Sequence, residues 1–117
     1  MTTIRLYGIP NCDTVKRART WLAASGRPHE FHDFKKAGVP ADRLDAWLAA
    51  AGWEKLVNRA GNTWRKLDAA TQAAVVDAAS ARALMLAQAS VIKRPVVVWP
   101  DAGITVGFDA AEFSRRL

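Results

Sequence analysis

The fold is decided by the stretch Tyr7-Gly8-Ile9-Pro10-Asn11-Cys12-Asp13-Thr14-Val15-Lys16, which contains the only cysteine of the 117-residue chain. An apolar run leads into this stretch and predicts a strand over Thr2–Tyr7. The Gly-Ile-Pro sequence predicts a turn. The apolar spacing after it predicts a helix from Asp13 to about Ser25, closed by the glycine that follows. Cys12 is therefore expected at the N-terminal end of the first helix.

Cys12 has the surroundings of a reactive thiol. Unpaired N–H groups and the positive end of the helix dipole favour a thiolate at a helix N-terminus, where a cysteine pKa can fall from about 8.5 to roughly 3.5–7.5. Lys16 and Arg19 share the helix face of Cys12 and favour the thiolate, whereas the adjacent Asp13 opposes it. Most lone cysteines are small buried hydrophobes, but the polar Asn-Cys-Asp-Thr sequence favours a reactive cysteine with a lowered pKa.

The composition indicates a single domain over residues 1–117. No apolar run approaches the roughly 20 residues that cross a bilayer, and the first residues do not have the pattern of a signal peptide. A single cysteine excludes an internal disulfide. A cytoplasmic protein without a membrane partner is therefore expected.

The charge of the chain bears on its partners. A net charge of +6 and a pI of about 10.1 make nucleic acid a candidate. The 17 basic residues are scattered, however, and no zinc spacing, recognition helix or aromatic RNA motif accompanies them. A basic surface or an anion-handling site is expected rather than direct nucleic-acid binding. His29 and His32 have no cysteine or carboxylate at metal spacing, so both are interpreted as strand residues and no metal site is expected.

Shorter signals predict the remaining elements. Residues 28–34 alternate as a second strand, which completes a βαβ unit with parallel strands and a right-handed crossover. The sequence then predicts a turn at 35–40, a helix to 51, and a short helix followed by an ordered loop over 53–67. It next predicts a helix over 69–79 capped by Asp68, and further helical turns capped by Ser80. A buried strand at 96–98 opened by Pro95, a return strand at 104–106 and a last helix with an Asp109/Glu112 capping box follow.

Three separated motifs resemble the arsenate reductase (ArsC)/Spx family, and within it the YffB-type subgroup. They are the stretch around Cys12, the segment Asn58–Leu67 and the sequence Ile92-Lys93-Arg94-Pro95. The resemblance spans essentially the whole chain. It implies an α/β, thioredoxin-like fold: a mixed four-stranded sheet built as β-α-β, a helical insertion at about residues 40–88, then β-β-α. It also implies a cis peptide bond before Pro95, close to Cys12.

The resemblance assigns roles to three residues. Cys12 matches the nucleophilic cysteine of glutaredoxin-coupled arsenate reductases, and Arg59 and Arg94 match two arginines that hold an oxyanion there and favour the thiolate. A third arginine of that family has no counterpart, since the corresponding place reads Gly107-Phe108-Asp109. This departure counts against arsenate reduction.

Further residues are expected to bind substrate around the cysteine. Asn11, Thr14 and Lys16 form the surrounding turn; a Thr14 hydroxyl or an Asn11 amide could reach the thiolate, or either could cap the helix. Pro95 would present backbone hydrogen-bonding groups to an extended substrate. Two aromatic residues, Trp64 and Phe108, could form an apolar wall, although buried aromatic residues more often belong to the core.

These observations lead to one principal hypothesis and two alternatives. The principal hypothesis is a thiol-dependent reductase that uses glutathione and acts on a small oxidised or anionic substrate through a mixed disulfide, without a bound cofactor. Because no second cysteine follows Cys12, glutathione or glutaredoxin must supply the resolving thiol. The alternatives are arsenate reduction coupled to glutathione or glutaredoxin, and an Spx-like regulator that binds RNA polymerase without catalysis. Such regulators typically carry a Cys-x-x-Cys pair, which this chain lacks.

Overall fold

A computed structural model describes residues 3–117, so Thr2, the predicted start of the first strand, lies outside the described residues. The described chain divides into two compact units. The first unit comprises the chain up to Ala37 together with Arg94–Leu117, and the second comprises Gly38–Lys93. The chain therefore leaves the first unit once and returns to it, with the second unit as the intervening segment.

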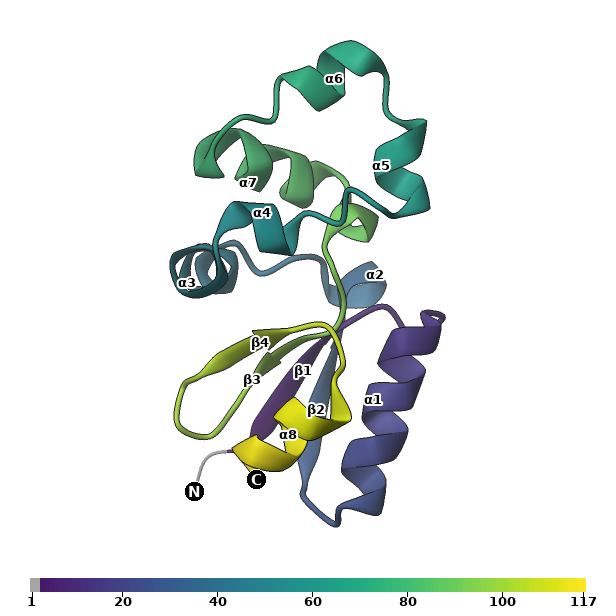
Figure 1. The fold of residues 1–117 in the computed structure, drawn as a ribbon, viewed down its shortest axis with the longest axis vertical. Coiled ribbons are helices and arrows are strands. Elements are labelled where there is room, and N and C mark those ends of the chain that lie inside the picture. The colour runs from purple at the N-terminus through teal and green to yellow at the C-terminus, as the bar shows by residue number, and fades with distance from the viewer. Residues whose placement is uncertain (1–2) are drawn as a thin grey trace. The chain divides into compact units, whose positions relative to one another are not determined.

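The first unit contains a mixed four-stranded sheet, as predicted, in the order β2-β1-β3-β4. Its strands are β1 (Ile4–Gly8), β2 (His29–Asp33), β3 (Val96–Val98) and β4 (Ile104–Val106). β1 pairs with β2 in parallel, and β3 pairs antiparallel with both β1 and β4. The four strands are labelled in the lower part of Figure 1. The predicted βαβ unit and the predicted hairpin of β3 and β4 are thus both confirmed.

Two helices, α1 (Asp13–Ala24) and α8 (Ala110–Arg116), pack on one face of this sheet. The buried residues of the two helices and of the sheet form one core cluster. The helices contribute Val15, Ala18, Leu22 and Phe113, and β1, β3 and the turn after β3 contribute Ile4, Leu6, Val97 and Trp99. The apolar residues of α1 lie three and four positions apart, so they form one face of the helix. The helix is held on the sheet by this face.

Gly8 permits the close approach of α1 to the end of β1. A Cβ atom at this position would lie 2.8 Å from Cγ2 of Val15 and 3.8 Å from Cβ of Arg94. A side chain of any size at position 8 would therefore displace the first turn of α1. The glycine of the sequence motif fixes the distance between the strand end and the helix that carries Cys12.

The second unit is helical. It contains α3 (Ala41–Ala51), α4 (Trp53–Leu56), α5 (Asn62–Lys66), α6 (Ala69–Ala73), α7 (Ala78–Ala87) and the 3₁₀ turn η1 (Ala89–Val91). α7 packs against α3 and α4. The fully buried residues of these three helices include Leu44 and Trp47 of α3, Leu56 of α4 and Met85 of α7. A single antiparallel bridge joins Val57 to Ile92 near the end of the unit.

Three predicted segments were wrong in detail. The turn expected at 35–40 begins with a one-turn helix, α2 (Phe34–Ala37), in which the backbone N–H of Lys35 donates to Asp33 at 2.8 Å. The ordered loop expected before residue 67 contains α5. The helix expected over 69–79 ends at Ala73, because the Asp77 carboxylate and the Ser80 side chain form a capping box that starts α7 instead.

The last helix has the cap that the sequence predicts but only half of the predicted capping box. The Asp109 carboxylate accepts the backbone N–H groups of Ala111 at 3.0 Å and Glu112 at 3.5 Å. The Glu112 side chain instead forms ion pairs with Arg115 and Arg116. Within residues 3–117 no helix has both the length and the apolar character needed to cross a membrane.

Candidate active site

Cys12 occupies the N-cap position of α1, as the sequence predicts. Its backbone is extended, with φ −87° and ψ 124°. The backbone N–H of Cys12 donates to the carbonyl of Ile9 at 3.2 Å, and its own carbonyl accepts the N–H of Lys16 at 2.9 Å. The first bond closes the Ile-Pro-Asn turn and the second starts the helix. The backbone is therefore hydrogen-bonded on both sides of Cys12.

The pKa of Cys12 is lowered, and three groups outweigh the effect of burial. Partial burial is the largest single influence and raises the pKa of the thiol. Hydrogen bonding from the backbone N–H of Val15, the hydrogen bond and positive charge of Arg94, and the backbone N–H of Thr14 all lower it. Because these groups favour the charged form together, the net pKa of Cys12 lies below that of an ordinary thiol. The thiolate is the nucleophilic form of cysteine.

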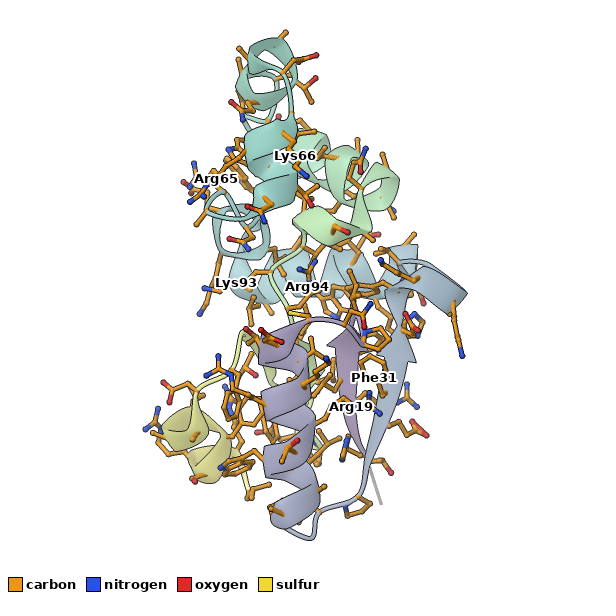
Figure 2. The ribbon with its side chains drawn as sticks, turned by 90° about the vertical axis from the view of Figure 1, so that its right-hand side faces the viewer. Arg19, Phe31, Arg65, Lys66, Lys93 and Arg94 are labelled. Carbon is orange, nitrogen blue, oxygen red and sulfur yellow. The ribbon has the colours of Figure 1, made fainter. Side chains whose placement is uncertain are left out.

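Arg94 reaches Cys12 from the segment that enters β3. The Arg94–Pro95 peptide bond is cis, as the resemblance implies. The carbonyl of Pro95 accepts the backbone N–H of Gly107 at 2.8 Å, which ties this segment to the end of β4. Figure 2 shows Arg94 at the N-terminal end of α1, where its guanidinium is a hydrogen-bond donor and a charge partner for the Cys12 sulfur.

The other residues predicted around the cysteine have different surroundings. Thr14 acts through its backbone N–H, not through the hydroxyl that the sequence suggested. Asn11 and Lys16 are exposed beside Cys12 in the chain, and neither contributes to the lowered pKa. Arg19 does not face the thiol; its guanidinium lies 4.2 Å from the centre of the Phe31 ring, as Figure 2 illustrates.

Arg59 belongs to the helical unit, and its role in the site stays a prediction. Within that unit its guanidinium lies 3.9 Å from the Glu54 carboxylate and 5.7 Å from the centre of the Trp53 ring. Its side chain is half exposed, so these contacts leave donors available to an anion. Trp64 also lies in this unit, on α5, where its carbonyl accepts the side-chain amide of Gln72.

One contributor was missed by the sequence analysis. The hydrogen bond from the backbone N–H of Val15 is the largest single interaction that lowers the Cys12 pKa. It is the third residue after the cap, and N-cap side chains commonly accept from this position. The N-cap position of Cys12 is the sequence signal that identifies this donor.

The arrangement can perform nucleophilic chemistry at sulfur. A partly exposed thiol lies beside backbone N–H groups and a guanidinium, which favour its thiolate form and other anions at the same place. Among residues 3–117, no three histidine, cysteine or carboxylate side chains come together in the way that a metal ion requires.

The sheet order, the helix packing and a cysteine at the start of α1 define a thioredoxin-like fold. The profile of the ArsC family matches residues 7–115. A Haemophilus influenzae protein described only as uncharacterized is 36% identical over 110 residues, covering 94% of this chain and 95% of its own length. The chain belongs to the ArsC family.

Solved structures are similar to this one over nearly the whole chain. A protein described as YFFB (PA3664) has a TM-score of 0.91 and 46% identity, covering 98% of this chain and 99% of its own. An arsenate reductase (ArsC) related protein from Brucella melitensis has a TM-score of 0.76 and 49% identity, covering 97% and 93%. Family membership supports, in general terms, a thiol-dependent reductase.

Proposed function

We propose that this protein is a glutathione-dependent thiol reductase in which Cys12 is the single nucleophile. The observation that carries the proposal is the lowered pKa of Cys12, whose sulfur interacts with Arg94 and with two backbone N–H groups. A thiol with a lowered pKa is ionised to a larger extent near neutral pH, so more of it can attack a disulfide sulfur.

The proposed reaction has two exchange steps. The Cys12 thiolate attacks a substrate disulfide R–S–S–R, forms a Cys12–S–S–R mixed disulfide and releases one thiolate RS⁻. A glutathione thiolate then attacks the mixed disulfide at the substrate sulfur, forms R–S–S–glutathione and returns Cys12 as its thiolate. A second glutathione can reduce that product to RSH and glutathione disulfide in solution.

An external resolving thiol is needed because Cys12 is the only cysteine of the chain. Glutathione suits this role because its carboxylates can pair with cations near the sulfur. Arg94 supplies one such cation in the first unit, and Arg59 is the predicted second one. Arginine presents paired N–H donors that match the two oxygens of a carboxylate.

The test measures covalent adducts and turnover of the purified protein. Intact-mass analysis after incubation with glutathione disulfide should show one glutathionyl group on the wild type and none on Cys12→Ser. Reduction of hydroxyethyl disulfide by glutathione should be accelerated by the wild type and lost in Cys12→Ser. Arg94→Ala should slow turnover strongly, whereas Arg115→Ala, an exposed arginine on α8, serves as the control.

Absence of both the adduct and the turnover would overturn the proposal. Arsenate offered with glutathione and glutaredoxin provides a second arm of the same assay. Turnover of arsenate in place of disulfide would make the protein an arsenate reductase instead. The missing third arginine is the reason for expecting no such turnover.

A further inference from the structure

A groove on the first unit lies along the exposed side of α1. It is lined on the helix by Lys16, Arg17, Thr20, Trp21 and Ala24, and on the opposite side by Phe108. Its volume is about 460 Å³, within the range of small-molecule clefts, roughly 300–1,000 Å³. Trp21 and Phe108 contribute aromatic rings to the lining, and the two cations, Lys16 and Arg17, belong to the N-terminal half of α1.

The groove begins about one helical turn after the nucleophile. Lys16 is one helical turn after Cys12, and its backbone N–H donates to the Cys12 carbonyl. With a rise of about 1.5 Å per residue, the lining residues of α1 extend from about 6 Å to about 18 Å beyond Cys12 along the helix axis. A substituent on the Cys12 sulfur would therefore have to extend about 6 Å along the helix to reach the first residue of the groove.

The far wall is connected to the site by the backbone. The Gly107 N–H donates to the Pro95 carbonyl at 2.8 Å, and Pro95 follows the arginine that contacts Cys12. Gly107 has a φ of +88°, a conformation that favours glycine, and the chain turns there to place Phe108. This segment therefore places an aromatic side chain beside the groove.

Both aromatic walls are supported from below by one buried ring. The Phe113 ring centre lies 5.6 Å from that of Trp21 and 5.0 Å from that of Phe108, with edge-on geometry in both pairs. Trp21, Phe108 and Cys12 all pack, partly buried, against the same core cluster. The walls are therefore held in place before any ligand binds, which lowers the entropic cost of binding.

The groove has an uncompensated positive charge. Lys16 and Arg17 are exposed, and the described residues give neither of them an ion pair. Two carboxylates are close in sequence to residues that line the groove: Asp13, which is exposed in the first turn of α1, and Asp109, which follows Phe108 and accepts two backbone N–H groups at the start of α8. An anionic group on the ligand would find two cations at the end of the groove closest to Cys12.

We propose that this groove selects the substrate of the reductase, and that the substrate is an organic disulfide carrying an apolar ring and a carboxylate. The inference rests on the proposed function, since the bound disulfide is the one that Cys12 attacks. The ring lies between Trp21 and Phe108, and the carboxylate lies at Lys16 and Arg17. Attack by the Cys12 thiolate breaks the S–S bond of the substrate and forms a mixed disulfide between Cys12 and the half that lies in the groove. The other half leaves as a thiolate in the same step.

The test compares four disulfides that differ in one property at a time. Dithiobis-nitrobenzoate is aromatic and anionic, dithiodipyridine aromatic and neutral, dithiodipropionate aliphatic and anionic, and hydroxyethyl disulfide aliphatic and neutral. The second-order rate constant for Cys12 is measured with each. Because the four probes differ in intrinsic reactivity, the result is read as the ratio of variant to wild type with the same probe.

The decisive variant fills the groove without touching the core. Ala24→Trp places a large side chain in the groove, whereas Ala23→Trp makes the same change at the next exposed residue, which does not line it. Ala24→Trp should slow the reaction with dithiobis-nitrobenzoate at least about fivefold more than with hydroxyethyl disulfide. Ala23→Trp should show no such difference between the two probes.

A second variant tests the charge. Arg17→Glu should slow both anionic probes about threefold to tenfold more than both neutral probes. Arg27→Glu makes the same change in net charge beyond the C-terminal end of α1 and should leave this preference unaltered. If the ratio of variant to wild-type rate constant were the same for all four probes in both Ala24→Trp and Arg17→Glu, while Cys12 still reacts, the proposal about the groove alone would be overturned. A Cys12 that reacts with none of the disulfides would overturn the proposed function instead.

Discussion

Phe113 is expected to be the residue on which the packing of α8 depends. It is the only buried residue of this seven-residue helix and is fully inaccessible to solvent. Its ring lies edge-on to those of Trp21, Phe108 and Trp99, with centres 5.6, 5.0 and 4.9 Å away. Because a helix this short is not stable on its own, the packing of α8 depends on the burial of Phe113.

The substitution Phe113→Ala should lower the free energy of unfolding by about 4 kcal/mol. Truncating a buried phenylalanine to alanine costs about 3–5 kcal/mol through lost burial and the cavity that remains. Three aromatic contacts, each worth about 0.5–1.5 kcal/mol, argue against the low end of this range. Since small domains are stable by only about 5–15 kcal/mol, the variant should be close to unfolding.

The assay is urea unfolding followed by both far-UV circular dichroism and tryptophan fluorescence, because the chain has two compact units and coincident transitions must be checked. Phe113→Leu keeps most of the volume and should lose only about 1–2 kcal/mol, so it stays measurable if the alanine variant does not fold. Ser114→Ala, at the adjacent exposed position, should change stability by less than about 0.5 kcal/mol. A loss below about 1.5 kcal/mol for Phe113→Ala would refute this account of α8.

Three further expectations follow from the first unit. Gly8→Ala should cost about 1–3 kcal/mol in urea unfolding, because the added Cβ would lie 2.8 Å from Val15; an unchanged midpoint would mean that α1 does not approach β1 this closely. Asp109→Ala should cost about 1 kcal/mol and Asp109→Asn much less, since the amide still accepts the N–H groups at the start of α8. The lowered pKa of Cys12 in the folded state makes stability depend on pH. The free energy of unfolding of the wild type relative to Cys12→Ala should be greatest above the pKa of the unfolded thiol and should fall as the pH decreases through the folded-state pKa. Unfolding in reductant at several pH values measures this difference, and a constant difference would contradict the expectation.

The sheet and the position of the nucleophile could be predicted because their signals are local and strong. The apolar residues of α1 repeat at helical spacing, and Gly8 and Pro10 mark the turn before it, so the strand, turn and helix follow directly. The β-branched run at 96–98 predicts a buried strand in the same way. In each case neighbouring residues alone carry the pattern.

The helical unit was predicted less well because its boundaries depend on competing local signals. An alanine-rich sequence favours one helix through residue 79. The structure divides it, because Asp77 and Ser80 satisfy the N–H groups at a new helix start and two β-branched residues precede them. The prediction of Ser80 as the cap was wrong by three residues, since Asp77 is the N-cap and Ser80 is the third residue after it.

The candidate site was predicted in its residues more than in its interactions. Cys12 and Arg94 were named from the sequence, and the structure brings them together. The donor from Val15 is a backbone group, which has no signature in residue type. The groove was not predicted because it combines α1 with Phe108, and residues so far apart in the sequence meet only through the sheet.

The central claim is that Arg94 and the start of α1 make Cys12 a thiolate of lowered pKa. The most direct test is the pH dependence of the alkylation rate of Cys12 by iodoacetamide, for the wild type and for Arg94→Ala and Arg59→Ala. The account predicts a wild-type pKa below the usual value of about 8.5 and a higher pKa in Arg94→Ala, because a hydrogen bond and a positive charge are lost. An ordinary pKa that does not change when Arg94 is removed would contradict the account.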